Sequence, residues 1–483
     1  MDTDDPLARL AECAELLEAI VADRSLLVDI DQPLRERLLI AAGRVSRPEK
    51  FERRALARAQ IRNRRVAKRT KDRSMAGESG IRRLRDSPVF QTPRRNGLLP
   101  APAAEARQVD RERVCYVCSE RFTELHHFYD QMCGDCGDFN FEKRRQTADL
   151  KGRVTLITGS RVKIGYQAAI MLLRAGSHVI CTTRFPRDAA QRYSAEEDYS
   201  EWAHRLEIHG IDLRHSPSVE ALCEELLARH TRLDFIINNA CQTVRRPPAF
   251  YEHMMGLELE ASGSVNGEGL ALLSTGSVDR WRGASSAAMS QVKLLAEDYD
   301  EATALFPAGE LDADLQQVDL RKVNSWRLKL AEVSTLELLE VHLVNAVAPY
   351  ILNARLKPLM LASPAQDKQI VNVSAVEGQF YRTYKSDRHP HTNMAKAALN
   401  MMTRTAAADY VEHGIYMNSV DTGWVTDEDP AHHAESKRKI HDFHPPLDIV
   451  DGGARICDPV FLAAAGDHMV WGQFLKDYRI VDW

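Results

Sequence analysis

The chain contains 483 residues, of which 44% are hydrophobic and 28% are charged, and its formal net charge is −5. This length exceeds one ordinary domain and predicts two or three folded units with at least one large core. No stretch of 18 uninterrupted apolar residues occurs, and the acidic N-terminus MDTDDPLARL lacks the basic and apolar segments of a signal peptide. These features argue against a secreted or membrane protein, and we expect a cytoplasmic one.

Residues 1–108 predict a helical, basic N-terminal region. Residues 5–43 carry apolar residues at helical spacing, which is typical of two helices. Between Arg44 and Arg95 there are 18 Lys or Arg against 5 Asp or Glu. This part is either a charged helix packed on an acidic face of the same protein or a polyanion-binding arm, with nucleic acid as the less favoured partner. A Pro/Ala-rich linker at 98–108 ends the region.

Residues 109–148 contain two Cys-x-x-Cys pairs separated by fourteen residues. Two such turns can bring four thiolates to about 2.3 Å from a zinc ion, and a segment this short could hardly fold without the metal. A redox dithiol or an unmetallated loop is the alternative. Because four cysteines leave no open coordination position, the zinc is expected to be structural. The predicted metal ligands are Cys115, Cys118, Cys133 and Cys136.

From residue 149 to residue 483 the pattern predicts strands that alternate with helices. VTLITGS at 154–160 is an apolar run that ends in a Gly-Ser turn, and a helical segment and a second apolar run at 177–184 follow it. In such a unit the free N–H groups of the helix N-terminus attract a phosphate. Gly159 and Gly165 permit the tight turn and the close approach. The predicted fold class is therefore α/β, a Rossmann-type doubly wound parallel sheet preceded by the basic region and the zinc-binding module.

Six motifs follow one another in this half of the chain. They are TGSRVKIG at 158–165, IDL at 211–213, DFIINNAC, LVNAVAPYIL, IVNVSA and NSVDTGWVT. With Lys396 they resemble the short-chain dehydrogenase/reductase family, over residues 151–483 apart from an insertion. Two positions depart from the family pattern: Lys163 stands at the middle glycine of the turn, and Thr422 stands where proline is usual.

The resemblance implies roles for individual residues. The implied catalytic residues are Ser374, Lys396 and the helix asparagine Asn345. Asp212 is implied to meet the adenine, and Lys396 to hold the nicotinamide ribose. The implied cofactor-binding residues are Gly159, Ser160, Arg161, Lys163, Ile164, Gly165, Asp212, Leu213, Asn239, Ala240 and Lys396.

Charge indicates which nicotinamide cofactor is preferred. A site for NAD places a carboxylate about twenty residues beyond the glycine turn, where it holds the ribose 2′-OH. Here that place holds Thr182, Thr183 and Arg184, and the turn adds Arg161 and Lys163. This cationic pocket favours the 2′-phosphate of NADP over NAD. The alternative is that Lys163 and Arg184 are solvated surface residues.

Residues 250–340 form a long insertion before the helix that carries Asn345. A lid over the binding cleft, an interaction surface and a loop that simply covers the helix layer are all open interpretations. Because the substrate pocket falls in this part of the chain, the sequence does not identify the substrate.

The tyrosine that family enzymes carry one helical turn before the lysine is absent. Thr392 stands four residues before Lys396, and a threonine hydroxyl does not ionise near neutral pH. The loop that precedes this helix is longer than in the family and contains Tyr381, Tyr384 and His391. We favour Tyr384 as the replacement proton donor and retain Thr392 as a candidate.

Two functions are open from the sequence. The first is an NADP-dependent oxidoreductase that transfers a hydride between nicotinamide and a carbonyl or alcohol substrate, with a non-standard proton donor. The alternative is a catalytically inactive NADP-binding scaffold or sensor, with nucleic-acid contact through the basic region. The expected partners are a small-molecule substrate and, by analogy with the family, a second copy of the chain in a homo-oligomer, but no membrane.

Overall fold

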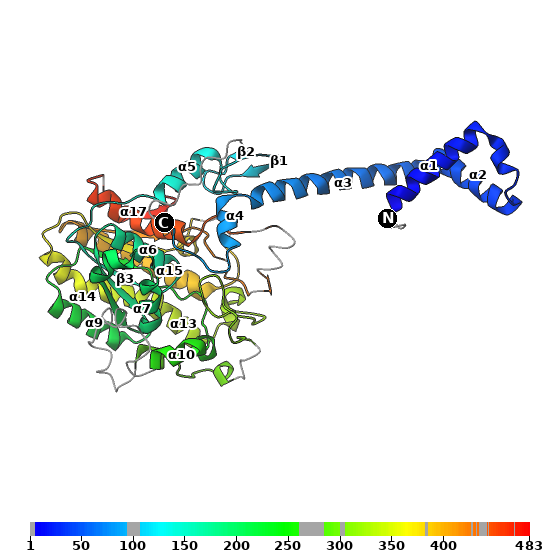
Figure 1. Cartoon of the computed structure of the whole chain (residues 1–483). Coiled ribbons are helices and arrows are strands. Elements are labelled where there is room, and N and C mark those ends of the chain that lie inside the picture. Colours follow the sequence, from blue (N-terminus) through cyan, green and yellow to red (C-terminus); the bar gives the residue numbers. More distant parts are fainter. Residues whose placement is uncertain are drawn as a thin grey trace. The chain divides into compact units, whose positions relative to one another are not determined.

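The computed structural model describes residues 5–93, 107–259, 285–299, 305–381, 385–426, 428–430, 432–433, 442, 444–467 and 469–483. The chain divides into two compact units, Met1–Lys71 and Asp72–Trp483. Figure 1 labels the elements of each unit.

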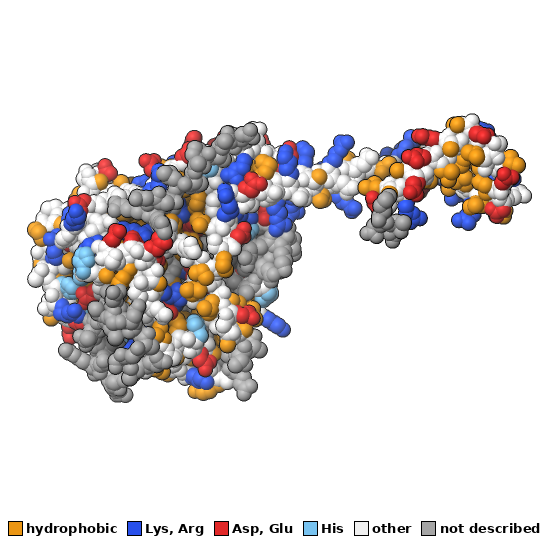
Figure 2. Space-filling model, viewed as in Figure 1, with side chains coloured by type: hydrophobic (Ala, Val, Ile, Leu, Met, Phe, Trp, Pro, Cys, Tyr) orange, Lys and Arg blue, Asp and Glu red, His pale blue; other side chains and the backbone are white. Residues whose placement is uncertain are grey.

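The N-terminal unit is helical. It contains α1 (Pro6–Ala22), η1 (Arg24–Leu27), α2 (Gln32–Ser46) and the first part of α3 (Lys50–Gly77). α1 begins where the Asp5 side chain accepts the N–H of Leu7 and Pro6 takes the first helical position. Lys and Arg side chains gather along α3 (Figure 2). The two helices expected in residues 5–43 and a helix over the basic segment are both present.

An eight-stranded sheet forms the centre of the second unit, as far as the chain is described. Its order is β10-β9-β8-β7-β6-β3-β4-β5, and the β9–β10 pair is antiparallel whereas the other pairs are parallel. The strand order reverses between β3 and β6, and doubly wound sheets bind ligands at such a point. The predicted doubly wound parallel sheet is therefore confirmed. Its strands are β3 (Val154–Thr158), β4 (His178–Thr183), β5 (Leu206–Gly210), β6 (Phe235–Asn238), β7 (Lys368–Ser374), β8 (Ile415–Asp421), β9 (Phe474–Lys476) and β10 (Arg479–Val481).

Helices cover both faces of the sheet. Alternate residues of a strand point to opposite sides, and the apolar side chains on each side need a helix layer to bury them. In β3, Ile157 packs in one hydrophobic core and Leu156 packs in the other. The first core is covered by α6 (Lys163–Arg174), α7 (Pro186–Ser194) and α17 (Ile449–Ala464). The second core is covered by α9 (Ser216–Arg229), α14 (Ala348–Ala362) and α15 (Pro390–Val411). Both faces are buried, which explains the nearly continuous apolar runs of the strands.

The helical run Thr335–Ala362 has the length and the mean hydropathy, 1.2, of a membrane span. It comprises α13 (Thr335–His342), the π-helical segment Leu343–Val347 and α14. α14 contacts β6 and β7, and its Leu352 and Leu356 are completely buried in the second core. Packing against the sheet therefore accounts for its apolar composition.

The four-cysteine segment packs against the start of α17. Buried Arg144 forms ion pairs with Asp448 at 2.6 Å and with Asp451 at 2.8 Å, and the Tyr129 hydroxyl donates to Asp451 at 2.5 Å. This segment and the sheet consequently belong to one compact unit. Its elements are β1 (Arg107–Val114), β2 (Arg121–Leu125), which pairs antiparallel with β1, and α5 (Gly134–Lys143); α4 (Gly80–Arg85) precedes them.

The described parts of the insertion 250–340 form short helical turns joined by loops. Phe250, Met254 and Phe306 pack around Phe185, two residues beyond β4. The insertion therefore covers the carboxyl edge of the sheet next to β4. Its elements are η3 (Pro248–Tyr251), α10 (Glu252–Leu259), α12 (Ser286–Met289), η5 (Ala296–Tyr299), η7 (Ser325–Arg327) and η8 (Leu330–Glu332). The remaining short elements are α8 (Tyr199–Trp202), η2 (Ala203–Arg205) and η10 (Val376–Gly378).

Candidate active site

A cavity of about 890 Å³ lies at the carboxyl edge of the sheet. The glycine turn after β3 and the end of β4 line one end, and the ends of β7, β8 and β9 line the other. Residues that are far apart in the sequence therefore meet in one place. Of the residues predicted from the sequence, Gly159, Arg161, Lys163, Ile164, Gly165, Arg184, Asp212, Leu213, Asn239, Ala240, Ser374, Thr392 and Lys396 line this cavity.

The two predicted glycines of the turn are required by close packing. Gly159 has a φ of +65°, and a Cβ on it would lie 2.8 Å from the Cα of Ala240. A Cβ on Gly165 would lie 2.3 Å from the carbonyl oxygen of Gly159. The side-chain N–H₂ of Asn239 donates to the carbonyls of Gly159 and Thr158, both at 3.0 Å. The turn thus stays narrow and its backbone lines the cavity, where a phosphate group could approach.

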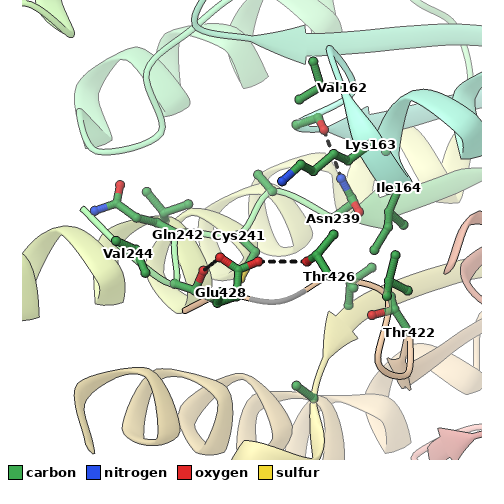
Figure 3. A pocket seen from close by; sticks show the side chains of 18 of the residues that line it. Val162, Lys163, Ile164, Asn239, Cys241, Gln242, Val244, Thr422, Thr426 and Glu428 are labelled. Carbon is green, nitrogen blue, oxygen red and sulfur yellow. Dashed lines mark hydrogen bonds between the residues drawn. The ribbon is translucent and has the colours of Figure 1, made fainter. Parts of the chain in front are cut away.

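Lys163 has a φ of +57°, in the left-handed region that suits the glycine expected there. It faces Glu428 across the cavity (Figure 3). Burial favours the neutral form of Glu428, but the cations of Lys163 and Arg246 hold its pKa below the usual range. The carboxyl group also accepts hydrogen bonds from the hydroxyls of Thr426, at 2.9 Å, and Thr243, at 3.3 Å. At neutral pH the glycine turn therefore faces a carboxylate.

Arginines gather at the end of β4. Arg184 donates to the hydroxyl of Tyr251 at 2.6 Å and lies over its ring, 4.5 Å from the centroid. Burial opposes ionisation of Tyr251, yet Arg184, Arg246 and Arg214 together lower the pKa of its hydroxyl. All three arginines line the cavity. Arg214 contacts Asp212 and Glu340, and Arg246 contacts Asp319, so Arg184 is the arginine of the three that best suits an anionic group.

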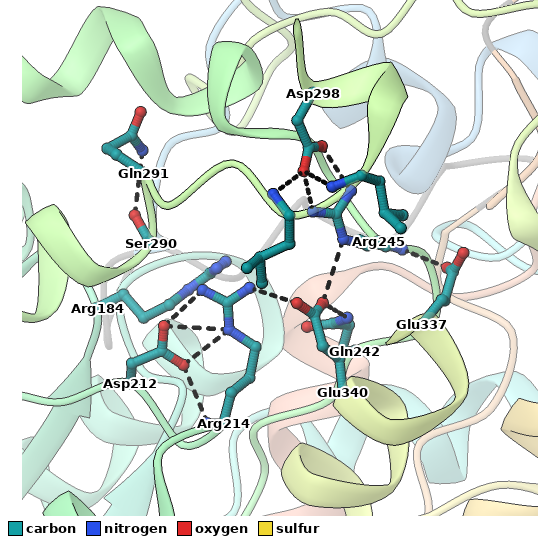
Figure 4. A network of polar contacts seen from close by, with 12 residues as sticks. Arg184, Asp212, Arg214, Gln242, Arg245, Ser290, Gln291, Asp298, Glu337 and Glu340 are labelled. Carbon is teal, nitrogen blue, oxygen red and sulfur yellow. Dashed lines mark hydrogen bonds and ion pairs between the residues drawn. The ribbon is translucent and has the colours of Figure 1, made fainter. Parts of the chain in front are cut away.

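Asp212, which was predicted to meet the adenine, is bonded to a neighbouring arginine. Arg214 contacts it at 2.6 Å and also contacts Glu340 at 2.9 Å (Figure 4). Burial raises the pKa of Asp212, but the hydrogen bonds and charge of Arg214 lower it further than burial raises it. The same network includes the buried pair of Arg245 with Asp298 in the insertion, at 2.6 Å. The insertion is thereby tied to the wall of the cavity.

Three predicted catalytic residues lie at the other end of the cavity. The Ser374 hydroxyl, at the end of β7, donates to the side-chain oxygen of Asn400 at 2.6 Å. The Lys396 ammonium donates to the carbonyl of Val373 at 2.8 Å. The Thr392 hydroxyl lies 3.4 Å from the carbonyl of Thr243. All three side chains are buried, so they are held in place before any ligand binds.

Two other predicted residues, Ser160 and Asn345, are described but do not line the cavity. Ser160 is buried. Asn345 lies in the π-helical segment. Its side chain accepts the N–H of Gln242 at 2.9 Å and donates to the Gln242 carbonyl at 2.8 Å, so it fixes the backbone of the chain after β6. Tyr384 lies outside the described residues. The neighbouring Tyr381 is 51% exposed and does not line the cavity.

The lengthened loop before α15 meets the insertion at an aromatic stack. The ring of His389 lies parallel to that of Trp326, with 4.0 Å between the centroids, and Trp326 lines the cavity. The next histidine along the chain, His391, is buried. Its burial, together with His389 and His342, lowers its pKa to about 4. His391 is therefore neutral at pH 7, which does not suit it as a general acid.

The four predicted metal ligands lie together. The sulfur atoms of Cys115, Cys118, Cys133 and Cys136 are all within 4.8 Å of one another. Cys118 Sγ and Cys133 Sγ are 3.7 Å apart. Thiolates at about 2.3 Å from a tetrahedral zinc ion stand about 3.8 Å apart, so this donor set fits zinc. Cys115 and Cys118 lie in the connection between β1 and β2, and Cys133 precedes α5.

Several residues that line the cavity were not predicted from the sequence. They are Tyr116, Arg214, Arg246, Tyr251, Trp326, Asp421, Trp424, Glu428 and Lys476. Asp421 and Trp424 directly flank the Thr422–Gly423 motif, so their positions could have been inferred. Tyr116 and Tyr251 come from segments assigned to the metal module and the insertion, where no local signal points to the cavity.

Family models match two long segments of the chain. The model described as short chain dehydrogenase matches residues 153–289, and that described as enoyl-(acyl carrier protein) reductase matches residues 320–446. Together the two segments exceed half of the chain.

Individual proteins match as well. An uncharacterised protein of Acanthamoeba polyphaga mimivirus is 30% identical over 378 residues, 75% of this chain and 74% of its own. Retinol dehydrogenase 14 of Homo sapiens is 35% identical over 103 residues, 19% of this chain and 31% of its own. The structure of a short chain dehydrogenase from Shigella flexneri aligns at 17% identity with a TM-score of 0.42 and covers 68% of this chain and 91% of its own.

Proposed function

This chain belongs to the short-chain dehydrogenase/reductase family, and from that premise we propose that it is an NADP-dependent oxidoreductase acting on a carbonyl or alcohol. The observation that carries the proposal is the single cavity that joins the glycine turn to Ser374 and Lys396. The glycine turn would hold the pyrophosphate, and the opposite end would hold the nicotinamide beside the substrate.

The preference for NADP rests on the end of β4. Arg184 occupies the place where a site for NAD has a carboxylate, and its guanidinium group lines the cavity beside the ring of Tyr251. Asp212 is paired with Arg214, so its carboxylate is neutralised. The 2′-phosphate of NADP would find charge-assisted hydrogen-bond donors, whereas the 2′-OH of NAD would find no comparable acceptor in Arg184.

The residues at the other end have separate tasks. Bound NADPH supplies the hydride. Lys396, held by the carbonyl of Val373, would hold the nicotinamide ribose, and Ser374, held by Asn400, would orient the substrate oxygen. A proton must then reach the alkoxide that develops on this oxygen. Thr392 cannot supply it through an ionisation near neutral pH, so we assign this step to Tyr384.

Binding and turnover of NADPH test the cofactor and the chemistry. We expect Arg184→Ala to weaken NADPH binding about tenfold to a hundredfold and to leave NADH binding nearly unchanged. Arg404→Ala, at an exposed position of α15, is the matched control. Substrate-dependent loss of NADPH absorbance should disappear in Lys396→Ala and in Ser374→Ala. Turnover that survives both changes would contradict the oxidoreductase proposal.

The proton donor has its own test. Tyr384→Phe keeps the ring and removes the hydroxyl, and it should abolish turnover while NADPH still binds. Thr392→Ala should retain most of the activity. The reverse result would assign the proton to Thr392. Turnover at the level of the unmutated chain in both variants would exclude both residues as the proton donor.

A scaffold or sensor that binds NADPH without chemistry is the second candidate. The threonine at position 392, whose hydroxyl already lies near a carbonyl, favours it. NADPH binding without turnover of any carbonyl or alcohol in a broad substrate panel would support this function.

We also propose that the four cysteines hold one structural zinc ion. Metal analysis of the full chain should find about one zinc per chain, because four thiolates complete a tetrahedral site. Cys118→Ser should lose the metal. Cys13→Ser, an exposed cysteine in α1, should keep it.

A further inference from the structure

Tyr116 connects the four-cysteine segment to the cavity. It lies between Cys115 and Cys118, whose sulfur atoms belong to the cysteine cluster. Its own side chain lines the cavity together with the ends of β8 and β9. The metal module and the nucleotide-binding half, which the sequence presents as separate, thus share one residue of the candidate active site.

The Tyr116 hydroxyl holds the turn that follows β8. It accepts the backbone N–H of Trp424 at 3.0 Å. The preceding N–H, that of Gly423, donates to the carboxyl group of Asp421 at 2.5 Å. Gly423 has a φ of +75°, and the position of a Cβ on it lies 3.1 Å from the Tyr116 hydroxyl oxygen. Two consecutive backbone N–H groups are therefore held by side chains in this turn.

These bonds stand where the family pattern has a proline. Proline fixes φ near −65°, whereas Thr422 leaves that torsion free. The hydrogen bonds that the N–H groups of Gly423 and Trp424 donate to side chains restrict the conformation of the same turn. Asp421 pairs in register with Ser374 across β8 and β7, so the turn lies next to the catalytic serine.

Tyr116 is itself held by the four-cysteine segment. Its N–H donates to the carbonyl of Gln131 at 2.9 Å, within the stretch between the two cysteine pairs. The neighbouring Cys115 is buried in a core with Leu447 and Ile449, at the start of α17. The ring also lies 5.3 Å from the ammonium of Lys476, a residue of β9. The backbone of Tyr116 is therefore bonded to the segment that carries the four cysteines.

We propose that Tyr116 is a positioning residue of the active site and that metal bound by the four cysteines holds it in place. Tyr116 fixes the turn of Gly423 and Trp424, which forms the wall beside the nicotinamide end of the cavity. The consequence for cofactor binding rests on the proposed function. The fixing of this turn by Tyr116 is independent of the proposed function, because it needs no cofactor.

Hydrogen exchange of the full chain tests the hold on the turn. Tyr116→Phe should speed exchange of the peptide that spans Asp421 to Thr426 about tenfold, because the N–H of Trp424 loses its acceptor. Removal of the metal from the unmutated chain with a chelator should have the same effect. The matched control is Tyr129→Phe in the same segment, whose hydroxyl contacts Asp451 and which does not line the cavity. It should leave exchange of this peptide unchanged.

Direct titration with NADPH provides the second measurement. Tyr116→Phe should weaken NADPH binding about fivefold, and Tyr129→Phe should not change it. Unchanged exchange in Tyr116→Phe would overturn the positioning role, and unchanged exchange after loss of the metal would overturn the role of the metal. If the unmutated chain binds no NADPH, the proposed function fails, while the exchange measurement still decides whether Tyr116 holds the turn.

Discussion

Glu428 places a carboxylate opposite the cationic glycine turn of the cavity. It faces Lys163 of the glycine turn, and that lysine together with Arg246 keeps the carboxyl group ionised. A bound pyrophosphate would bring further negative charge to the same turn. Glu428 and the cofactor therefore compete for the charge of Lys163.

Removing this charge should strengthen cofactor binding. In Glu428→Gln the shape of the side chain is kept and the repulsion is lost, so we expect NADPH to bind about fivefold more tightly at low salt. Glu412→Gln, an exposed position after α15, should have no effect. Calorimetric titration measures both, and weaker binding in Glu428→Gln would mean that the carboxylate supports the site.

The lowered pKa of His391 predicts how the free energy of unfolding depends on pH. In the folded chain its pKa is about 4 because of burial and the neighbouring His389 and His342, whereas in the unfolded chain it is about 6.5. The unfolded chain therefore binds more protons between these values, and stability must decrease as the pH falls through this window. His391 alone accounts for on the order of 3 kcal/mol by pH 4.

The variant His391→Leu removes this titration. Its unfolding midpoint in urea should fall less steeply between pH 6.5 and pH 4 than that of the unmutated chain. His413→Leu, at an exposed position, should leave the slope unchanged. Identical slopes for all three chains would place the acid sensitivity elsewhere, for example at His126 or His444, whose pKa values are also about 4.

At the scale of elements, the insertion 250–340 forms part of the cavity wall. Tyr251 and Trp326 line the cavity, and Trp326 stacks on His389 of the lengthened loop. The buried pair of Arg245 with Asp298 anchors the insertion to the chain after β6. Asp298 also accepts the N–H groups of Leu294 and Leu295, both at 2.9 Å. This favours a role at the binding cleft over a simple cover of the helix layer.

Breaking this anchor should be costly. Asp298→Ala removes the bidentate partner of a buried arginine, which typically destabilises a fold by about 3 kcal/mol or more. We expect a clear decrease in the urea midpoint and weaker NADPH binding through loss of the wall at the end of β4. The control is Asp387→Ala, which breaks the exposed pair with Lys329 and should not shift the midpoint measurably. Equal effects of the two changes would contradict the anchoring role.

At the scale of the whole molecule, the chain consists of two compact units. The division falls after Lys71, inside α3. The second unit contains the cavity, the sheet and the cysteine cluster. Cofactor binding should therefore not depend on residues far upstream of the division.

A chain that begins at Arg65 tests this independence. It should bind NADPH within about twofold of the full chain, because distant sites contribute nearly additively.

Filter binding with duplex DNA at low salt, on both chains, also separates the two interpretations of the basic segment. Binding that is lost on truncation and weakens steeply with salt would favour a polyanion-binding arm. A loss of NADPH binding in the shorter chain would contradict the independence of the units.

Much of the candidate site could be predicted because its motifs are local. Gly159 and Gly165 are needed by a turn within eight residues, and Ser374 ends a strand that is recognisable from its apolar run. Lys396, like the catalytic role of Ser374, was implied by the resemblance to the family and not by spacing. Tyr116 and Tyr251 could not be predicted, since each reaches the cavity only through contacts with segments far away in the sequence.

The sequence by itself determined the alternation of strands and helices, the phosphate-binding turn and the family, because periodicity, glycines and motif order are written in short stretches. Only the tertiary structure decided which charges meet. It pairs Asp212 with Arg214, places Glu428 opposite Lys163 and brings Tyr116 from the cysteine segment to the turn after β8. Such contacts depend on how distant elements pack, and no local pattern along the chain encodes them.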